Sequence, residues 1–135
     1  MRKHGAKEVL GTGKKFSIRI NEIHSDRRKV DRRGIAAADV VLVPLEDGDR
    51  TEALKKLSKR VIAIDLNPMS RTARAADVTI VDNIVRALPL MTKDAKRLSH
   101  DSKTKLHEIV KHFHNETNLG TMLKFMLGRL KNLSK

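Results

Sequence analysis

Three segments of the sequence combine a carboxylate with helix-starting residues and an arginine. They hold Asp47, Asp49, Arg50 and Thr51 in the first segment, Asp65, Asn67, Ser70, Arg71 and Thr72 in the second, and Asp82, Asn83 and Arg86 in the third. Arginines and the backbone amides at helix N-termini suit phosphate oxygens, whereas carboxylates suit a ribose hydroxyl, an amine or Mg²⁺. The recurring combination predicts a site for a phosphorylated ligand, with a nucleotide as the expected class.

These residues also have a purely structural interpretation. Asp and Ser at helix starts commonly act as N-caps, and one such segment alone would be explained in that way. Three segments in succession weaken that explanation. Arg50, Arg71 and Arg86 each fall in the first turn of a predicted helix, where a cation is mildly unfavourable. Their position therefore favours a nearby anion over simple exposure to solvent.

The chain around these segments alternates short apolar runs with helical patterns. Continuous apolar runs rich in β-branched residues predict buried strands, and a polar residue before each helical run predicts an N-cap. The predicted strands cover residues 40–45, 61–66 and 78–81, and the predicted helices cover 50–59, 70–76 and a third run that starts at 84. Asp49 or Thr51 would cap the first helix and Ser70 the second, while Pro89 would stop or kink the third.

Strands that alternate with helices pair in parallel through right-handed crossovers. Residues 36–92 therefore predict the β-α-β-α-β centre of an open α/β sheet. Every parallel strand delivers its following loop to the same edge, so the three polar segments should converge in the crevice outside the carboxyl ends of the strands. Residues 1–135 are expected to form a single α/β domain, because no linker or internal repeat separates the flanks from this centre.

The flanking regions show different patterns. Upstream, residues 8–10 and 16–20 are candidate strands, and the basic stretch 26–34 is expected to be a solvated loop or a helix end. Downstream, residues from about 94 to 133 predict two amphipathic helices. Their apolar stripes hold Leu106, Ile109, Val110 and Phe113 in the first helix, and Leu119, Met122, Leu123, Met126, Leu127, Leu130 and Leu133 in the second. The longer stripe is expected to pack in the core or between subunits.

Composition excludes several classes of protein. Hydrophobic residues make up 39% of the chain and charged residues 33%, which is too apolar for a disordered chain and too charged for an integral membrane protein. The absence of cysteine excludes disulfides and zinc–thiolate sites, and the absence of Trp and Tyr leaves few rings on which bases could stack. His107 and His112 are spaced one residue too far apart for the zinc-protease helix motif, so no protein-held metal site is expected.

The formal net charge of +13 suggests an anionic partner. The excess of Lys and Arg lies in residues 1–35 and 93–135, whereas residues 36–92 are balanced. Solvated basic helix faces explain this distribution most simply, and a nucleic-acid-binding role for the flanks is the alternative.

The three polar segments are long enough to carry a family resemblance. Residues 44–54 (PLEDGDRTEAL), 64–73 (IDLNPMSRTA) and 80–87 (IVDNIVRA) together resemble the archaeal 4-phosphopantoate–β-alanine ligases, also called phosphopantothenate synthetases. The likeness is clear from residue 34 to residue 90 and weaker around residues 4–11. It implies a cytoplasmic, homodimeric, Rossmann-like enzyme of coenzyme A biosynthesis. Such an enzyme joins 4-phosphopantoate to β-alanine and cleaves ATP to AMP and pyrophosphate.

The resemblance also implies positions that bind ATP, with Mg²⁺ expected to accompany it. These positions are Asp65, Leu66, Asn67, Arg71, Thr72, Asn83 and Ile84. Asp65 would suit the ribose, and the Asn83 side chain with the Ile84 amide would suit a phosphate or the base edge. Further contacts with phosphate or substrate are expected from Asp49, Arg50, Thr51, Ser70, Asp82 and Arg86. The resemblance assigns no catalytic residue.

Members of this family are longer, and this chain begins where their second half does. An N-terminal portion that would add arginines to the ATP and phosphopantoate sites is therefore expected to be missing, and the basic stretch 27–33 departs from the family pattern. The main hypothesis is the ligase or its nucleotide-binding half. Two alternatives stay open, a basic nucleic-acid-binding module and a phosphosugar-binding α/β domain.

Overall fold

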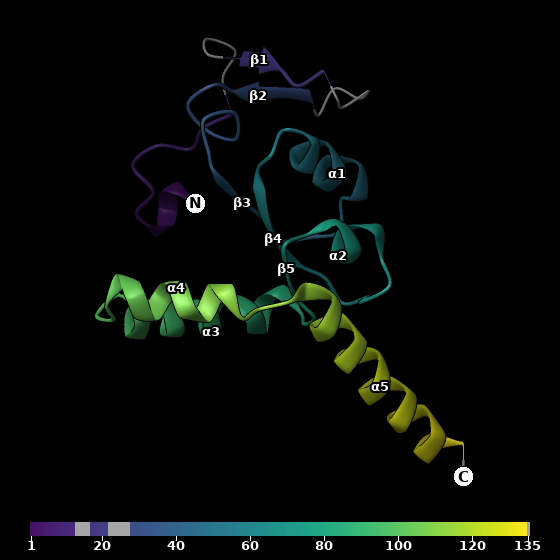
Figure 1. Ribbon diagram of the computed structural model, residues 1–135. Coiled ribbons are helices and arrows are strands. Elements are labelled where there is room, and N and C mark those ends of the chain that lie inside the picture. Colours follow the sequence, from purple (N-terminus) through teal and green to yellow (C-terminus); the bar gives the residue numbers. More distant parts are fainter. Residues whose placement is uncertain (13–16, 22–27, 135) are drawn as a thin grey trace.

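A parallel sheet of three strands forms the centre of the fold. The computed structural model describes residues 1–12, 17–21 and 28–134 (Figure 1). Strands β3 (Val40–Val43), β4 (Arg60–Ile64) and β5 (Val78–Ile80) lie side by side in the order of the sequence, with Val41 beside Val61 and Ile62 beside Val78. The predicted α/β class, with a Rossmann-like open parallel sheet, is confirmed.

Helices α1 (Gly48–Lys56) and α2 (Arg71–Ala75) cover one face of this sheet (Figure 1). Right-handed crossovers that step in the same direction place both helices on the same side. The buried cluster between helices and sheet consists of Val43, Leu54, Val61, Ala63 and Ala76. Removal of this apolar surface from water, at about 25 cal/mol per Å², is the main force that holds the layers together.

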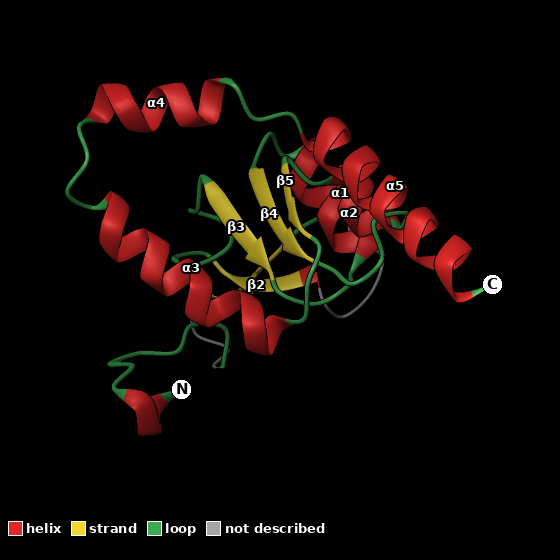
Figure 2. Cartoon of the chain, turned by 90° about the horizontal axis from the view of Figure 1, so that it is seen from below, coloured by secondary structure: helices red, strands yellow, loops and turns green. Residues whose placement is uncertain are grey.

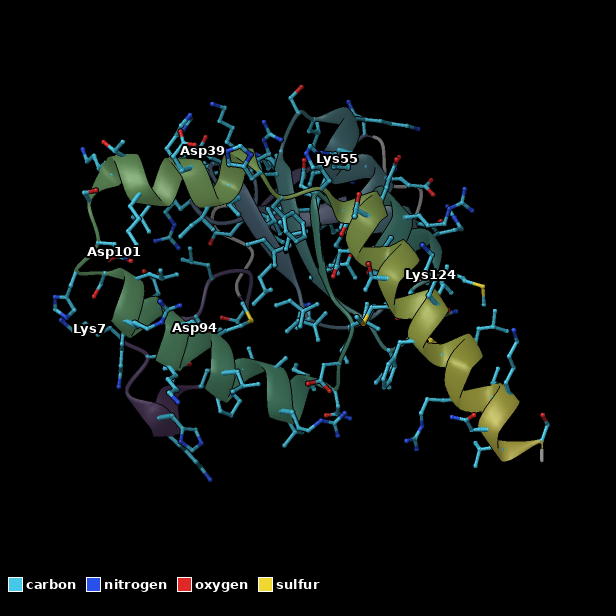
Figure 3. The ribbon with its side chains drawn as sticks, turned by 60° about the horizontal axis from the view of Figure 1, so that its bottom comes forward. Lys7, Asp39, Lys55, Asp94, Asp101 and Lys124 are labelled. Atoms are coloured by element: carbon cyan, nitrogen blue, oxygen red, sulfur yellow. The ribbon has the colours of Figure 1, made fainter. Side chains whose placement is uncertain are left out.

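Asp77 ties the sheet to α1. Lys55 projects from α1 (Figure 3), and its Nζ lies 2.7 Å from both carboxylate oxygens of Asp77. The backbone N–H of Val61 donates to the same carboxylate at 2.8 Å. Burial raises the pKa of Asp77, but the hydrogen bonds from Lys55 and Val61 outweigh burial, so the pKa lies below its usual value. The carboxylate is therefore ionised at neutral pH and fixes α1 against β4.

Side-chain caps begin the helices that follow the strands. Ser70 caps α2 as predicted, because its Oγ accepts the Ala73 N–H at 2.9 Å. The predicted caps of α1, Asp49 and Thr51, are wrong. The N-cap is Asp47, whose carboxylate accepts the Arg50 N–H at 3.2 Å, so the helix begins two residues earlier than the sequence pattern indicates.

Helix α3 (Ile84–Leu98) continues through Pro89, so the prediction that the helix stops there is wrong. A proline inside a helix removes one backbone hydrogen bond, the one that its own N–H would make to the carbonyl four residues earlier. That carbonyl belongs to Val85, which is exposed, so water can replace the missing donor.

The N-terminal region contains a short 3-10 helix, η1 (Arg2–His4), and an antiparallel strand pair, β1 (Ser17–Arg19) with β2 (Lys29–Asp31). The first strand confirms part of the predicted run 16–20, whose residue 16 lies outside the described residues, as do residues 13–15, 22–27 and 135. Residues 8–10 form no strand, because Gly11 adopts a left-handed conformation with φ of 81° and the Thr12 hydroxyl donates to the Val9 carbonyl.

The basic stretch 26–34 was predicted as a loop or helix end, and its described part instead contains β2. Val30, the apolar residue within this stretch, is buried against Ile20 and Ala53, which anchors the strand. Asp31 at the end of β2 accepts hydrogen bonds from the guanidinium and the backbone N–H of Arg33, which lower its pKa to about 2. The predicted loop is therefore wrong because a single buried valine outweighs its charged neighbours.

Helix α5 (Asn115–Leu133) closes the outer edge of β5 with side-chain amides. The Thr79 N–H donates to Asn115 Oδ1 at 2.8 Å, and Asn115 Nδ2 donates to the carbonyls of Ala73 and Ala76 at 2.9 and 3.0 Å. Asn118 Nδ2 donates to the Thr79 carbonyl at 2.8 Å. The first turns of α5 thus take the place of a neighbouring strand.

The predicted C-terminal helices are present as α4 (Lys103–Lys111) and α5, whereas residues 94–98 belong to α3. The first half of the long apolar stripe packs into this chain, where Leu119 is buried and Met122 and Leu123 are half-buried. Met126, Leu127, Leu130 and Leu133 are exposed, so core packing of the stripe is wrong for the second half of α5. Within the described residues, none of the helices combines the length and apolar character needed to cross a membrane.

Strand β3 is more exposed than its continuous apolar sequence predicts. The side chains of Val40 and Leu42 are 54% and 40% exposed. Both lie on the face of the sheet opposite α1 and α2, and no described helix lies across that face. Figure 2 shows the strands between α3 and α4, with the two helices beside the sheet. The prediction that β3 is fully buried is therefore wrong.

Candidate functional site

A pocket of about 280 Å³ lies at the carboxyl ends of the three parallel strands. Each strand contributes the residues at which it ends. The lining residues are Pro44, Leu45 and Glu46 after β3, Ile64, Asp65, Leu66 and Asn67 from β4, and Asp82, Asn83 and Ile84 after β5. The pocket is where the sequence places the crevice of an open parallel sheet.

The structure brings together six of the predicted site residues in this pocket. These are Asp65, Leu66, Asn67, Asp82, Asn83 and Ile84. The other predicted residues lie outside its lining, namely Asp49, Arg50, Thr51, Ser70, Arg71, Thr72 and Arg86. Four lining residues were not singled out from the sequence, Pro44, Leu45, Glu46 and Ile64. They could have been found as the residues that directly end each apolar run.

Asp65 is buried and held in one orientation. Its Oδ1 accepts the Asn67 N–H at 2.9 Å, and its Oδ2 accepts a short hydrogen bond from the Ser70 hydroxyl. Ser70 in turn caps α2, so the carboxylate is fixed by the same residue that starts the helix. Each carboxylate oxygen can accept a second hydrogen bond, which suits a ligand hydroxyl.

Thr51 and Thr72 are fully buried. The Thr72 hydroxyl accepts the Asp47 N–H at 2.9 Å, so α2 is joined to the loop that follows β3. The side chain of Thr72 therefore fixes the loop after β3 relative to the start of α2, without lining the pocket itself.

Arg71 lies against carboxylates of α1. Its Nε and Nη2 donate to the two oxygens of Glu52 at 2.9 Å each, and Nη2 lies 2.9 Å from Asp49 Oδ1. The hydrogen bonds to Glu52 and Asp49 raise the pKa of Arg71, and the guanidinium lowers the pKa of Glu52. A Cβ on Gly48 would lie 2.9 Å from the Cβ of Arg71, so glycine at this position permits the close approach.

Arg86 makes a similar pair with Asp82 at the pocket wall. Arg86 Nε donates to Asp82 Oδ1 at 2.8 Å, and the Asn83 N–H donates to the same oxygen at 2.6 Å. The hydrogen bonds from Arg86 and then from Asn83 lower the pKa of Asp82. Asn83 is also the N-cap of α3, because its Oδ1 accepts the Val85 N–H at 2.8 Å.

The lining combines apolar side chains with a small number of oriented polar groups, which is typical of small-molecule sites. Apolar residues from all three strand ends suit a planar base, and Asp65 suits a hydroxyl. In the part of the chain that the structure describes, no three His, Cys, Asp or Glu side chains gather as a metal site.

Comparison with known sequences identifies the family of this chain. The family model for phosphopantothenate/pantothenate synthetase matches residues 1–129. The chain belongs to this family. The region that matches the phosphopantothenate/pantothenate synthetase family contains the three polar segments, whose residues line or support the pocket.

Relatives in this family include ligases from several species. The 4-phosphopantoate–β-alanine ligase of Thermococcus onnurineus is 51% identical over 128 residues, which are 95% of this chain and 48% of that protein. The ligases of the same name from Thermococcus kodakarensis and Methanosarcina mazei are 48% and 44% identical, over 95% and 96% of this chain and 48% and 50% of their own length. The chain spans about half the length of these relatives and matches their C-terminal half.

Proposed function

We propose that this chain is the nucleotide-binding half of an ATP-dependent ligase. The ligase joins 4-phosphopantoate to β-alanine in the cytoplasm, as a step of coenzyme A biosynthesis, and releases AMP and pyrophosphate. The observation that carries this proposal is the pocket at the carboxyl edge, lined by Asp65, Asn67 and Asn83, in a chain 51% identical to a relative with this ligase name.

Different residues around the pocket would bind different parts of ATP. The apolar strand ends would enclose the adenine, and the fixed carboxylate of Asp65 would accept a ribose hydroxyl. Asn83 uses its Oδ1 for the helix cap, which leaves its Nδ2 to donate to the nucleotide. Mg²⁺ commonly binds through nucleotide phosphates, water and one or two carboxylates, and Asp82 is a carboxylate of the pocket wall.

A homodimer is part of the same proposal. The exposed apolar residues of α5, Met126, Leu127, Leu130 and Leu133, support it as a surface suited to contact between subunits.

Titration calorimetry with ATP and Mg²⁺ on the folded chain tests the nucleotide site directly. Saturable binding is expected, with ribose 5-phosphate giving no heat. Binding of the sugar phosphate without binding of ATP would favour the phosphosugar alternative. Binding of RNA that weakens steeply with salt, without ATP binding, would favour the nucleic-acid alternative.

Replacement of Asn83 by Ser is expected to weaken ATP binding about fivefold with little loss of stability. Serine is as good an N-cap as asparagine, so α3 keeps its cap. The variant loses the Nδ2 donor, and a neutral hydrogen bond contributes about 1 kcal/mol. Calorimetry measures the affinity and urea unfolding measures the stability.

The Asn83→Ala variant is the control for the contribution of the helix cap to stability. Asn83→Ala removes both the donor and the cap, so it should lose about 1 kcal/mol of stability as well as affinity. Unchanged ATP affinity in Asn83→Ser would show that Asn83 is a helix cap and nothing more.

Replacement of Glu52 by Gln is expected to strengthen ATP binding. Arg71 is proposed to contact the nucleotide, yet its guanidinium is paired with Glu52 in the free chain. Removal of the competing charge should improve the affinity about twofold to fivefold, the size of effect expected from an exposed ion pair. Glu108→Gln on α4 is the control, because Glu108 contacts His112 and Lys111 rather than Arg71. Equal affinity in wild type and Glu52→Gln would show that Glu52 does not compete with the nucleotide for Arg71, which also lies 2.9 Å from Asp49.

A further inference from the structure

One face of the central sheet is apolar and largely uncovered by the described residues, although Ile64 at its carboxyl end is buried. Both α1 and α2 lie on the opposite face, and no described helix crosses this one. The side chains on the open face that are exposed or half-buried are Val40 and Leu42 of β3, Ile62 of β4, and Val78 and Ile80 of β5. Sheets of parallel strands normally bury both faces under helices, so this face needs a cover.

Helices α3 and α4 flank the open face and carry exposed apolar side chains of their own. Figure 2 shows them on either side of the strands. Helices α3 and α4 together form a helical hairpin. Its exposed apolar residues are Val85, Leu88 and Leu90 on α3, Ile109 and Val110 on α4, and Phe113 after α4. Neither helix packs extensively against another described element. A helix as short as α4 is marginal in water without tertiary contacts, so the hairpin is suited to pack against further protein.

The two edges of the sheet differ. The edge at β5 is closed, because Asn115 and Asn118 bond to the Thr79 backbone. At the other edge, no described strand pairs with the outer side of β3. An open edge offers unpaired backbone donors and acceptors to another strand. A further strand can therefore join this sheet beside β3.

The topology of the sheet indicates the direction of that further strand and the face on which its helices lie. Ligands of open α/β sheets bind at the point where the strand order reverses, between two strands whose helices lie on opposite faces. The order β3, β4, β5 runs in one direction and contains no reversal. A parallel strand beside β3, with its helices on the open face, would create the reversal next to Pro44, Leu45 and Glu46, which already line the pocket.

A second copy of this chain does not meet that requirement. Two identical β3 strands that pair across a two-fold axis run antiparallel, which sends their carboxyl ends to opposite edges. The relatives, in contrast, contain a further portion about as long as this chain, N-terminal to the region that matches it.

We infer that the open face of the sheet and the outer edge of β3 are the docking surface for the N-terminal half of the ligase, which adds a parallel strand beside β3 and helices over Val40 and Leu42. This inference rests on the proposed function, which identifies the chain with the C-terminal half. The docked half supplies the second wall of the pocket. The statement holds whether that half belongs to the same polypeptide or to a separate one.

Coexpression tests the inference without any substrate. The probe is the N-terminal half of the Thermococcus onnurineus ligase, produced together with this chain carrying an affinity tag. A complex that holds the two halves in equal numbers is expected on size-exclusion chromatography with light scattering, with two copies of each half if the proposed homodimer forms. Leu42→Glu and Val40→Lys should reduce recovery of the complex tenfold or more, because a buried charge at the centre of an apolar interface is strongly unfavourable. Leu130→Glu on α5 is the control and should leave the two halves associated, even where it separates the proposed homodimer into single pairs of halves.

Circular dichroism of each tagged variant alone shows whether it folds. If Leu42→Glu does not fold, recovery of the complex with Val40→Lys tests the inference. The inference is overturned if no complex forms, if the complex tolerates both β3 variants, or if the chain alone forms a dimer that these variants break. Hydrogen exchange adds an independent readout, since the β3 amides should become protected in the complex. Because ATP takes no part, a complex that forms but binds no ATP would refute the proposed function while the docking surface stands.

Discussion

Supplied with 4-phosphopantoate, β-alanine, ATP and Mg²⁺, this chain alone is expected to form AMP about a thousandfold more slowly than an ordinary enzyme turnover of about 10 s⁻¹. Adenylation requires the attacking carboxylate and the α-phosphate to be held in line, and the site that we propose in this pocket serves the nucleotide alone. Arg71 and Arg86 are already paired with carboxylates of this chain. Loss of positioning and of charge stabilisation together account for the expected deficit.

The assay follows AMP and pyrophosphate, with each substrate omitted in turn. Any residual AMP that comes from this site should fall in the Asn83→Ser variant, whereas contaminating ligase activity should not. AMP formation at an ordinary rate, dependent on both 4-phosphopantoate and β-alanine, would contradict the prediction. It would show that the residues of this chain suffice for both halves of the reaction.

Replacement of Asn115 by Ala is expected to lower the free energy of unfolding by about 3 kcal/mol. One amide side chain accepts the Thr79 N–H and donates to the carbonyls of Ala73 and Ala76. Its removal takes the acceptor from the Thr79 N–H and a donor from the Ala76 carbonyl, whereas the Ala73 carbonyl keeps the Thr79 hydroxyl as a donor. Each unsatisfied buried group costs about 1–3 kcal/mol. Urea unfolding followed by circular dichroism measures the difference.

Neighbouring positions on α5 provide graded controls. Asn118→Ala removes one hydrogen bond to the Thr79 carbonyl and should cost about 1 kcal/mol. Thr117 is exposed, and Thr117→Ala should leave stability nearly unchanged. A cost for Asn115→Ala no greater than that for Thr117→Ala would mean that water replaces the amide at the edge of the sheet.

The centre of the fold could be predicted because its signals are local. Each strand is a short apolar run, and each following helix begins at a polar cap, so the order of elements from residue 40 to residue 88 follows from neighbouring residues. The convergence of Asp65, Asn67 and Asn83 follows as well, since parallel strands deliver their loops to one edge. The positions of Arg71 and Thr72 depend instead on how α2 meets α1. Their partners Glu52 and Asp47 are 19 and 25 residues away, and no spacing in the sequence indicates these contacts.

The flanks could be predicted less well, because their structure depends on tertiary contacts. Val30 forms a strand within a charged stretch because it is buried against Ile20 and Ala53. The apolar sequence of β3 correctly indicates a strand and predicts cover on both faces, yet Val40 and Leu42 are exposed in this chain. A hydrophobic pattern shows that a surface is to be buried, and it does not show which polypeptide covers it.

The edge bonds of Asn115 also bear on the order in which the molecule folds. Each pair of neighbouring strands is separated in sequence by one short helix, so the sheet forms through contacts that are close along the chain. The bonds from Asn115 to Thr79 and Ala73 span 36 and 42 residues. During synthesis on the ribosome, β3, β4 and β5 emerge before α5, and domains begin to fold from the N-terminal side. The sheet is thus expected to assemble on the nascent chain, and α5, which is translated after β5, then secures the outer edge of β5.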